Sequence, residues 1–176
     1  LFMDRIYDSS RRHFNLFFDN AWNSLVEMDS YGHDVEAGWL LCEAARVLED
    51  RQLMDRANRL ALDVTDACLV EGLSDKGYMM YEKKGGRTTG HASWWGQIET
   101  MIACVNAWQI SGNDVYLQSA DTVWTFVKDC MIDREYGEWY SDCFDGEPKK
   151  DTPKVSMWRC PYHTVRLGVE IHNRLK

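Results

Sequence analysis

Apolar residues return every three or four positions in five stretches of the chain, which is the period of a helix with one buried face. Signals for helix ends frame these stretches. Asp50 and the pair Asn113-Asp114 stand at turns between paired helices, and Gly72 and Gly112 fall just past helix ends. The pattern predicts helices over residues 34–49, 53–70, 94–110, 115–131 and 162–175.

The first four predicted helices form two pairs that repeat along the chain. Cys42 in the first pair and Cys104 in the second lie 62 residues apart. A third helix pair is predicted to begin at Pro161, since proline suits the first turn of a helix. Each second helix is followed by a short aromatic stretch that we expect to be extended, at residues 74–81 and 134–140. The repeat predicts an all-α toroid of helical hairpins, with short β-hairpin-like stretches between the helices.

Size and charge narrow the class of protein. A length of 176 residues with 45% apolar residues predicts one globular domain over residues 1–176. The net charge of −8 argues against nucleic acid or an anionic membrane as a partner. No apolar run approaches the roughly 20 residues that span a bilayer. The ends carry no secretory or targeting motif, so we expect a cytoplasmic protein, and a first residue other than Met leads us to expect sequence upstream of Leu1.

The six cysteines show neither a CxxC motif nor the spacing of zinc ligands. Cys68 and Cys130 repeat the 62-residue separation of the first matched pair. Small residues at equivalent positions of a repeat are typical of a buried core. We therefore expect neither a disulfide nor a structural metal.

Candidate chemistry gathers where the first helix of each repeat begins. In a toroid whose first helices face inward, these positions form one layer around a common mouth. Spacings of three or four residues place one pair from each set on a shared helix face, namely His33 with Glu36, Trp95 with Glu99 and His163 with Arg166. Two sets contain histidine, which takes and gives a proton near neutral pH. The sets are His33 with Glu36, Trp94 and Trp95 with Glu99, and Trp158 with His163 and Arg166.

Each motif alone also has a plain structural interpretation. The acidic residues after His33 suit a helix N-terminus, where the helix dipole favours negative charge. The Trp94-Trp95 pair suits a core, and Arg166 suits a surface ion pair. Because the three sets fall in one layer of successive repeats, we favour a shared function for them.

The other histidines and a metal site are weaker candidates. His13, His91 and His172 follow no repeat, and we expect His91 to be a loop residue. A metal site around His33 is disfavoured because helical geometry turns Asp34 away from the face that His33 presents. We therefore predict no metal.

Three motifs together resemble a known family. In order and spacing they are similar to the cellobiose and mannobiose 2-epimerases, a branch of the N-acylglucosamine 2-epimerase superfamily. The resemblance covers nearly the whole chain and implies an (α/α)6 barrel of about twice this length, of which the chain is the C-terminal half. The motifs are residues 30–37 followed by Trp39, Trp94-Trp95 followed by Gln97 and Glu99, and residues 158–163 followed by Arg166.

The resemblance also implies a reaction that requires no cofactor. The family inverts C2 of the reducing-end aldose of a β-1,4-linked disaccharide, which converts a glucose unit to mannose. After ring opening, the C2 proton lies next to an aldehyde, and its removal gives an enediolate that is reprotonated on the other face. His33 and His163 are then the two acid/base groups, and Glu36 orients His33. The implied substrate-binding residues are Trp94, Trp95, Glu99, Trp158 and Arg166.

Other functions stay open. The same superfamily includes N-acylglucosamine 2-epimerases and aldose–ketose isomerases that act on monosaccharides. A glycoside hydrolase on a similar toroid could use Glu36 and Glu99 as its pair of carboxylates. A half-barrel without activity could be a binding or assembly module, which pairs with a missing N-terminal half or with itself.

Overall fold

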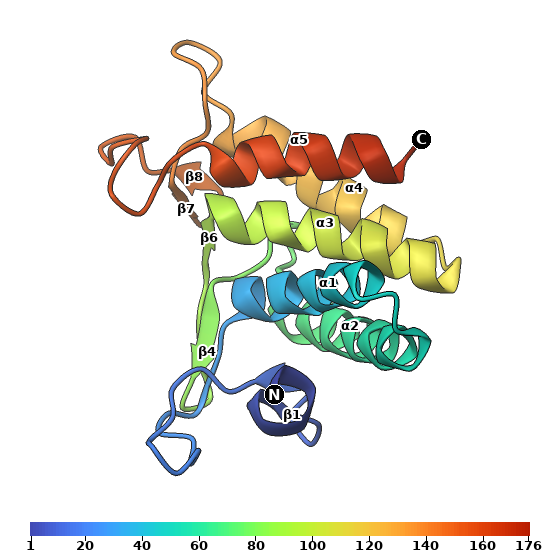
Figure 1. Ribbon diagram of the computed structural model, residues 1–176. Coiled ribbons are helices and arrows are strands. Elements are labelled where there is room, and N and C mark those ends of the chain that lie inside the picture. Colours follow the sequence, from blue (N-terminus) through green and yellow to red (C-terminus); the bar gives the residue numbers. More distant parts are fainter.

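The computed structural model describes residues 1–176 and contains five α-helices (Figure 1). All five predicted helices are confirmed, although α1 begins three residues before its predicted start. A π-helical turn, η1, covers Phe2–Ile6, and a second, η2 (Val127–Met131), continues directly from α4. The helices are α1 Tyr31–Val47, α2 Arg51–Gly72, α3 Trp94–Ser111, α4 Val115–Phe126 and α5 Tyr162–Arg174.

Two of the predicted helix-end signals act as expected. The Asp50 carboxylate accepts a hydrogen bond from the backbone N–H of Leu53 at 3.0 Å, which caps α2. Gly112 ends α3 in the left-handed conformation, with φ of 70°. Gly72, in contrast, is the last residue of α2 itself. A side chain there would lie 2.8 Å from the ring of Tyr31, so close packing requires this glycine.

Eight short strands form three antiparallel sheets beside the helices. Their order is β1–β2 in the first sheet, β3–β4–β5 in the second and β6–β7–β8 in the third. In the second sheet, for example, Met28 pairs with Lys84 and Glu82 with Thr89. The strands are β1 Tyr7–Asp8, β2 His13–Phe14, β3 Met28–Asp29, β4 Glu82–Lys84, β5 Arg87–Thr89, β6 His91–Ser93, β7 Asp142–Phe144 and β8 Glu147–Pro148.

The hairpins lie after the two aromatic stretches that were expected to be extended. Those stretches take part only in the isolated bridges from Leu73 to Met79 and from Ile132 to Trp139. Regular hairpins follow at residues 82–89 and 142–148. The β-hairpin-like stretches expected between the helices are therefore confirmed, and the first aromatic stretch also enters the core, where Met79 is 1% exposed.

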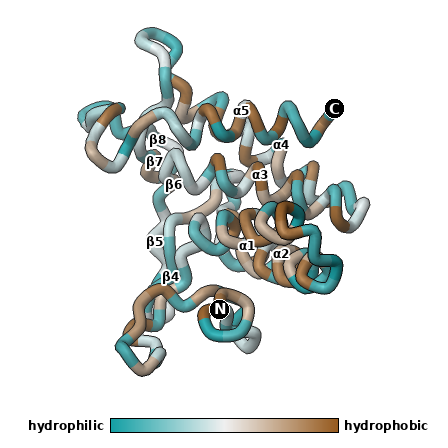
Figure 2. The backbone as a smooth tube through the Cα atoms, in the orientation of Figure 1, coloured by the Kyte–Doolittle hydropathy of each residue, from teal (hydrophilic) through white to brown (hydrophobic).

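The helices stand in two layers. Figure 1 shows α1, α3 and α5 side by side, and all three begin at the end of the molecule where the strands gather. Helix α2 packs on α1, and α4 packs on α3. The first helix of each pair therefore forms one layer and the second helix a layer behind it. Figure 2 shows hydrophobic stretches along the helices, while the projecting loops are mixed.

The matched residues of the repeat occupy equivalent places in this core. Cys42 packs with Ala57 between α1 and α2, and Cys104 packs near Ala120 between α3 and α4. Burial raises the pKa of the Cys104 thiol to about 12. Of the matched cysteines, Cys42, Cys68 and Cys104 are buried and Cys130 is half-buried, whereas Cys160, which has no match in the repeat, is exposed.

Apolar residues are exposed on the two helices at the edges of the arc. On α1, Leu40 and Val47 are exposed, and on α5 so are Val165 and Val169. An apolar groove of about 650 Å³ runs along α1 between this helix and the N-terminal residues, and His33 lies among its lining. No helix is both long and apolar enough to cross a membrane.

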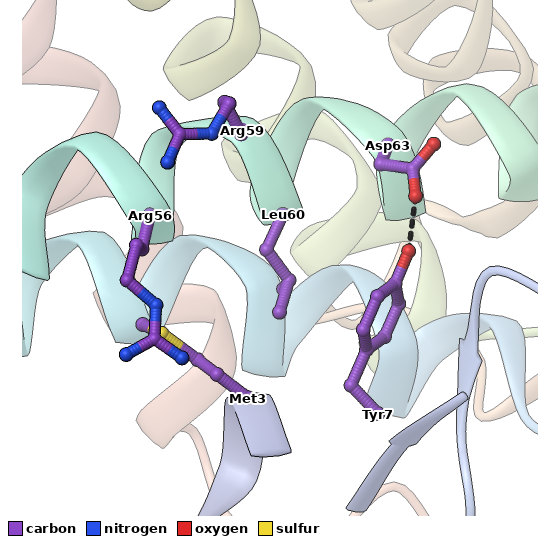
Figure 3. A pocket seen from close by; sticks show the side chains of 6 residues that line it. All are labelled: Met3, Tyr7, Arg56, Arg59, Leu60 and Asp63. Atoms are coloured by element: carbon purple, nitrogen blue, oxygen red, sulfur yellow. Dashed lines mark hydrogen bonds between the residues drawn. The ribbon is translucent and has the colours of Figure 1, made fainter. Parts of the chain in front are cut away.

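A second hollow of about 460 Å³ lies between η1 and α2 (Figure 3). The Tyr7 hydroxyl donates a hydrogen bond to Asp63 across it, and Leu60 forms part of its floor. None of the predicted layer residues lines this hollow, so it is separate from the site described next. The hydrogen bond from Tyr7 to Asp63 joins the N-terminal segment to α2.

Candidate active site

The two histidines at the helix starts meet on one aromatic ring. His33 is the third residue of α1, His163 is the second residue of α5, and Trp95 is the second residue of α3. The ring centre of Trp95 lies 4.6 Å from that of His33 and 5.9 Å from that of His163. A Cβ on Gly32 would lie 2.6 Å from the Trp95 ring, so glycine lets the indole rest on the start of α1.

Each histidine is anchored through Nδ1. His163 Nδ1 lies 2.6 Å from Glu99 Oε1, and His33 Nδ1 lies 2.8 Å from the hydroxyl of Ser30. Because a carboxylate only accepts, Nδ1 of His163 carries the hydrogen and donates it to Glu99. The other nitrogen, Nε2, is left free for chemistry on both rings.

Glu99 is fully buried, and donors surround both of its oxygens. Oε1 accepts from His163 and, at 3.0 Å, from Arg166 Nη1, while Oε2 accepts from Trp39 Nε1 at 2.9 Å. The expected role in binding sugar hydroxyls is therefore corrected, because no oxygen of Glu99 faces solvent. Glu99 holds His163 and Arg166 in place instead.

Arg166 joins two carboxylates of the predicted layer. Its Nη1 donates to Glu36 Oε1 at 2.6 Å as well as to Glu99. Burial acts to lower the pKa of Arg166, but the hydrogen bond to Glu36 and the charge of Glu99 outweigh it and raise the pKa. The guanidinium also lies over the rings of Trp39, at 5.6 Å, and Tyr162, at 5.3 Å.

This geometry corrects the expected partner of His33. Glu36 was expected to orient His33 from one turn along the same helix, but its bond is to Arg166 on α5, and His33 is bonded to Ser30. Glu36 is half-buried, and its second oxygen accepts no hydrogen bond. It is thus the carboxylate of the site that is best placed to meet a substrate.

The other two tryptophans differ in position. Trp94 is half-buried, its ring lies edge-on to His163 at 6.1 Å, and the guanidinium of Arg159 stacks on it at 4.9 Å. Trp158 is 81% exposed, and its only hydrogen bond is from its backbone N–H to Ser156. The structure therefore brings Trp94 and Trp95 into the histidine cluster and leaves Trp158 outside it.

Two further aromatic residues border the site. Tyr81 lies edge-on to Trp95 at 6.4 Å and stacks on His91 at 4.6 Å, and His91 stacks in turn on Phe144 at 5.0 Å. His91 was expected to be a loop residue, but it is half-buried and opens β6. Burial lowers its pKa. The one sequence signal that His91 borders the site is that it lies three residues before Trp94.

One group of ligand types lies inside the cluster. Ligand atoms of Glu36, Glu99 and His163 lie within 4.8 Å of one another. Arg166 already bridges the two carboxylates, so a cation occupies their shared space. Asp34 points away from the site, as its helix position predicts, and accepts from the backbone N–H of Phe14 at 2.8 Å.

An arc of helical hairpins whose first helices line one layer defines a class of fold, the α/α-toroid, and two anchored histidines lie against one indole where these helices begin. The sequence comparison narrows this class. A family described as N-acylglucosamine 2-epimerase (GlcNAc 2-epimerase) matches residues 1–166, and the chain belongs to this family.

Known relatives agree with this assignment. A cellobiose 2-epimerase from Bacteroides fragilis is 40% identical over 97% of this chain and 44% of its own length. The crystal structure of a sugar epimerase from a ruminal bacterium superposes with a TM-score of 0.94 at 34% identity, over 98% of this chain and 45% of that one. The cellobiose 2-epimerase of Bacillus thermoamylovorans gives a TM-score of 0.92 at 33% identity, over 99% and 45%.

The chain thus spans somewhat less than half the length of these relatives. The predicted fold, part of an (α/α)6 barrel, is confirmed by the superpositions. The resemblance recognised from the three motifs is confirmed as well.

Proposed function

We propose that this chain, completed by the first half of its barrel, is a carbohydrate 2-epimerase that acts on the reducing-end aldose of a β-1,4-linked disaccharide. The observation that carries the proposal is the pair of imidazoles on Trp95, each with Nδ1 anchored and Nε2 free. Two proton-transfer groups beside one flat apolar surface suit a reaction that moves a proton from one face of a carbon to the other.

The proposed reaction removes the proton from C2 of the sugar and returns a proton to the opposite face of the same carbon. The sugar ring opens to an aldehyde, and one histidine takes the C2 proton through Nε2. The electron pair of the broken C–H bond moves toward the carbonyl oxygen and forms an enediolate. The other histidine gives a proton to the opposite face of C2, and ring closure returns an aldose with inverted C2.

The two histidines have different supports for this exchange. Glu99 accepts the Nδ1 hydrogen of His163 whether the ring is neutral or charged, so Nε2 keeps its direction before and after proton transfer. The Ser30 hydroxyl can donate or accept a hydrogen bond, so it can pair with Nδ1 of His33 in both the neutral and the protonated ring. Both rings are therefore held in place through a full proton cycle.

The surrounding side chains suit a sugar. The half-buried indole of Trp95 offers an apolar face to the C–H groups of a pyranose or its opened chain. The free oxygen of Glu36 accepts from a hydroxyl, and Arg166 keeps that carboxylate fixed. The exposed ring of Trp158 lies on a loop outside the cluster and would stack on the second sugar unit.

The unpaired helix faces support a missing half. The groove along α1 is lined mainly by apolar side chains such as Phe2, Leu40 and Leu41, and it reaches His33 and Glu36 at one edge. Related enzymes are more than twice as long as this chain. We propose that the preceding half of the barrel covers this groove and closes the site, and self-association through the same face is the alternative.

The competing activities differ in their products. An N-acylglucosamine 2-epimerase would share the mechanism but take a monosaccharide, and an aldose–ketose isomerase would return the proton to C1. A hydrolase that uses Glu36 and Glu99 is disfavoured, because Glu99 is buried and all its partners are donors, which leaves no oxygen to reach a glycosidic bond.

The test is product analysis with full-length protein on cellobiose and on mannobiose. We expect conversion of the glucose unit to mannose and back, and variants His33→Asn and His163→Asn should each lower kcat by about 10²–10⁴-fold. His172→Asn, at an exposed position on the far end of α5, is the control and should retain full activity. Near-full activity in either site variant would contradict the proposal, as would release of monosaccharide or formation of a ketose.

A further inference from the structure

A polar hollow of about 200 Å³ lies apart from the histidine cluster. It forms where the N-terminal strand β2, the β3–β4–β5 sheet and the C-terminal end of α2 meet, and no apolar side chain lines it. Its lining carries Glu27, Asp29 and Glu71 against the two cations Arg11 and Lys83. The hollow therefore has a net negative charge when its histidine, His13, is neutral.

His13 points an unsatisfied nitrogen into this hollow. The side chain is 1% exposed, and Nδ1 bonds to Asp34 Oδ2 at 2.8 Å. Nε2 is buried and has no hydrogen-bond partner. A buried nitrogen without a hydrogen-bond partner is unfavourable, and its nearest acceptor is Glu71 Oε1 at 3.6 Å, so an ion held between the two would satisfy both. A histidine whose Nδ1 donates to a carboxylate is the usual arrangement in metal sites, because it presents the Nε2 lone pair outward.

Two carboxylates face this nitrogen. Ligand atoms of His13, Asp29 and Glu71 lie within 4.8 Å of one another, and Glu71 Oε1 is 3.6 Å from His13 Nε2. Two ligands of a tetrahedral zinc ion, each about 2.0–2.1 Å from the metal, stand roughly 3.4 Å apart. The observed separation is close to this spacing and too long for a hydrogen bond.

The neighbouring cations leave oxygens free for a metal. Lys83 donates to Glu71 Oε2 at 2.7 Å, so Oε1 is the oxygen that faces His13. Arg11 bonds to Oδ1 of Asp29, and Oδ2 of Asp29 accepts no hydrogen bond. Each carboxylate thus keeps one oxygen for a cation of the protein and has one available for a bound ion.

We propose that His13, Asp29 and Glu71 form a binding site for a divalent transition-metal ion, with Zn²⁺ as the probe. One imidazole nitrogen and two carboxylate oxygens are ligands that suit this class of ion. The ion would join β2, β3 and the end of α2, and so would fix the N-terminal segment on the helical core. Its place outside the histidine cluster gives it a structural role.

The test is calorimetric titration of metal-free, full-length protein with ZnCl₂, in a Cys160→Ser background that removes the exposed thiol. We expect a site on this chain whose affinity falls at least tenfold in His13→Gln and in Glu71→Gln. Glu71 is half-buried, so its variant tests the site without a change in the core. Binding should be unchanged in His172→Gln, because His172 is exposed and distant in sequence from the site.

Lys83→Met distinguishes a metal site from a cluster of ion pairs. Removal of this positive charge should strengthen Zn²⁺ binding several-fold and increase the rise in Tm that Zn²⁺ produces. Absence of binding to the parent protein would overturn the proposal. So would an affinity that is the same in the parent, His13→Gln and Glu71→Gln, or one that weakens in Lys83→Met.

Discussion

At the scale of single residues, the carboxylate of Glu99 is the centre of the site. Three donors meet its two oxygens: Nε1 of Trp39, Nη1 of Arg166 and Nδ1 of His163. A carboxylate satisfies all three because it is acceptor-only. An amide in its place would turn an NH₂ group toward at least one of these donors, and the ring of His163 would lose its fixed orientation.

The variant Glu99→Gln in the full-length protein should therefore lose about 10–100-fold in kcat, the usual effect of removing a carboxylate that orients a functional histidine. KM should change much less, because Glu99 has no free oxygen for substrate. Steady-state kinetics on cellobiose separate the two constants. Glu147→Gln, at an exposed strand position, is the control. A large rise in KM with unchanged kcat would show that Glu99 binds substrate instead.

The protonation of His91 gives a prediction for pH. Its ring is stacked between Tyr81 and Phe144, and burial lowers its pKa, so the folded state favours the neutral ring. The unfolded chain takes up the proton first as the pH falls, so this stability is present above the unfolded pKa and is lost as the pH falls through the folded pKa. Chemical denaturation between pH 7.5 and 5 should show a decline that is smaller in His91→Gln. An equal decline in both proteins would contradict the assignment.

Sequence reasoning found which residues of the site gather but not which partners they take. The repeat placed His33, Trp95 and His163 in one layer, and the structure brings them together. The partner expected for His33 was Glu36, one helical turn away, but Arg166 lies 130 positions further on and takes that carboxylate. Contacts between distant segments follow from packing, which spacing along one helix does not encode.

At the scale of helices and strands, glycine positions determine how closely the first helices approach. Gly32 lies against the Trp95 ring, with 2.6 Å to an added Cβ, so Gly32→Ala should destabilise the protein by about 1–3 kcal/mol through overpacking. It should also lower activity, since Trp95 contacts both histidines. Gly168 on α5 has nothing within 4 Å of its Cβ position, so Gly168→Ala should stabilise by about 0.4–1 kcal/mol.

Urea unfolding of the two variants measures both effects in one experiment. The opposite signs matter more than the sizes, because both substitutions add the same methyl group to a helix. Equal changes in the free energy of unfolding would show that helix propensity, and not the contact between Gly32 and Trp95, controls both sites.

The elements themselves were largely predictable. Five periodic stretches gave five helices, since an amphipathic helix leaves a strong signal over several turns. The exact strands of the hairpins left no such signal, because they are only two or three residues long. Their turns, Gly85-Gly86 and Asp145-Gly146, take positive φ at both positions, which is the better local signal.

At the scale of the whole molecule, the exposed faces of α1 and α5 distinguish this chain from a closed ring. The number of helix pairs in the closed barrel was inferred from the resemblance to a known family. The periodic pattern alone does not determine how many helix pairs close a ring. The superposed relatives supply that number, and the chain spans less than half of them.

The groove along α1 should be the surface on which the first half of the barrel packs. Residues 1–176 and a separately produced first half should associate in solution, as measured by analytical ultracentrifugation. Leu40→Glu should weaken this association at least tenfold by burial of an unpaired charge. Val70→Glu, at an 82% exposed position on the outer helix α2, should not. Equal effects of the two substitutions would place the contact elsewhere.

The central claim, proton exchange at C2 between two histidines, is tested most directly by turnover of cellobiose by full-length protein in D₂O. The proposed mechanism predicts an epimerised product that carries deuterium at C2, because the proton returned to that carbon comes from a histidine that exchanges with solvent. An epimer that retains its original hydrogen at C2 and no deuterium there would contradict the two-histidine mechanism.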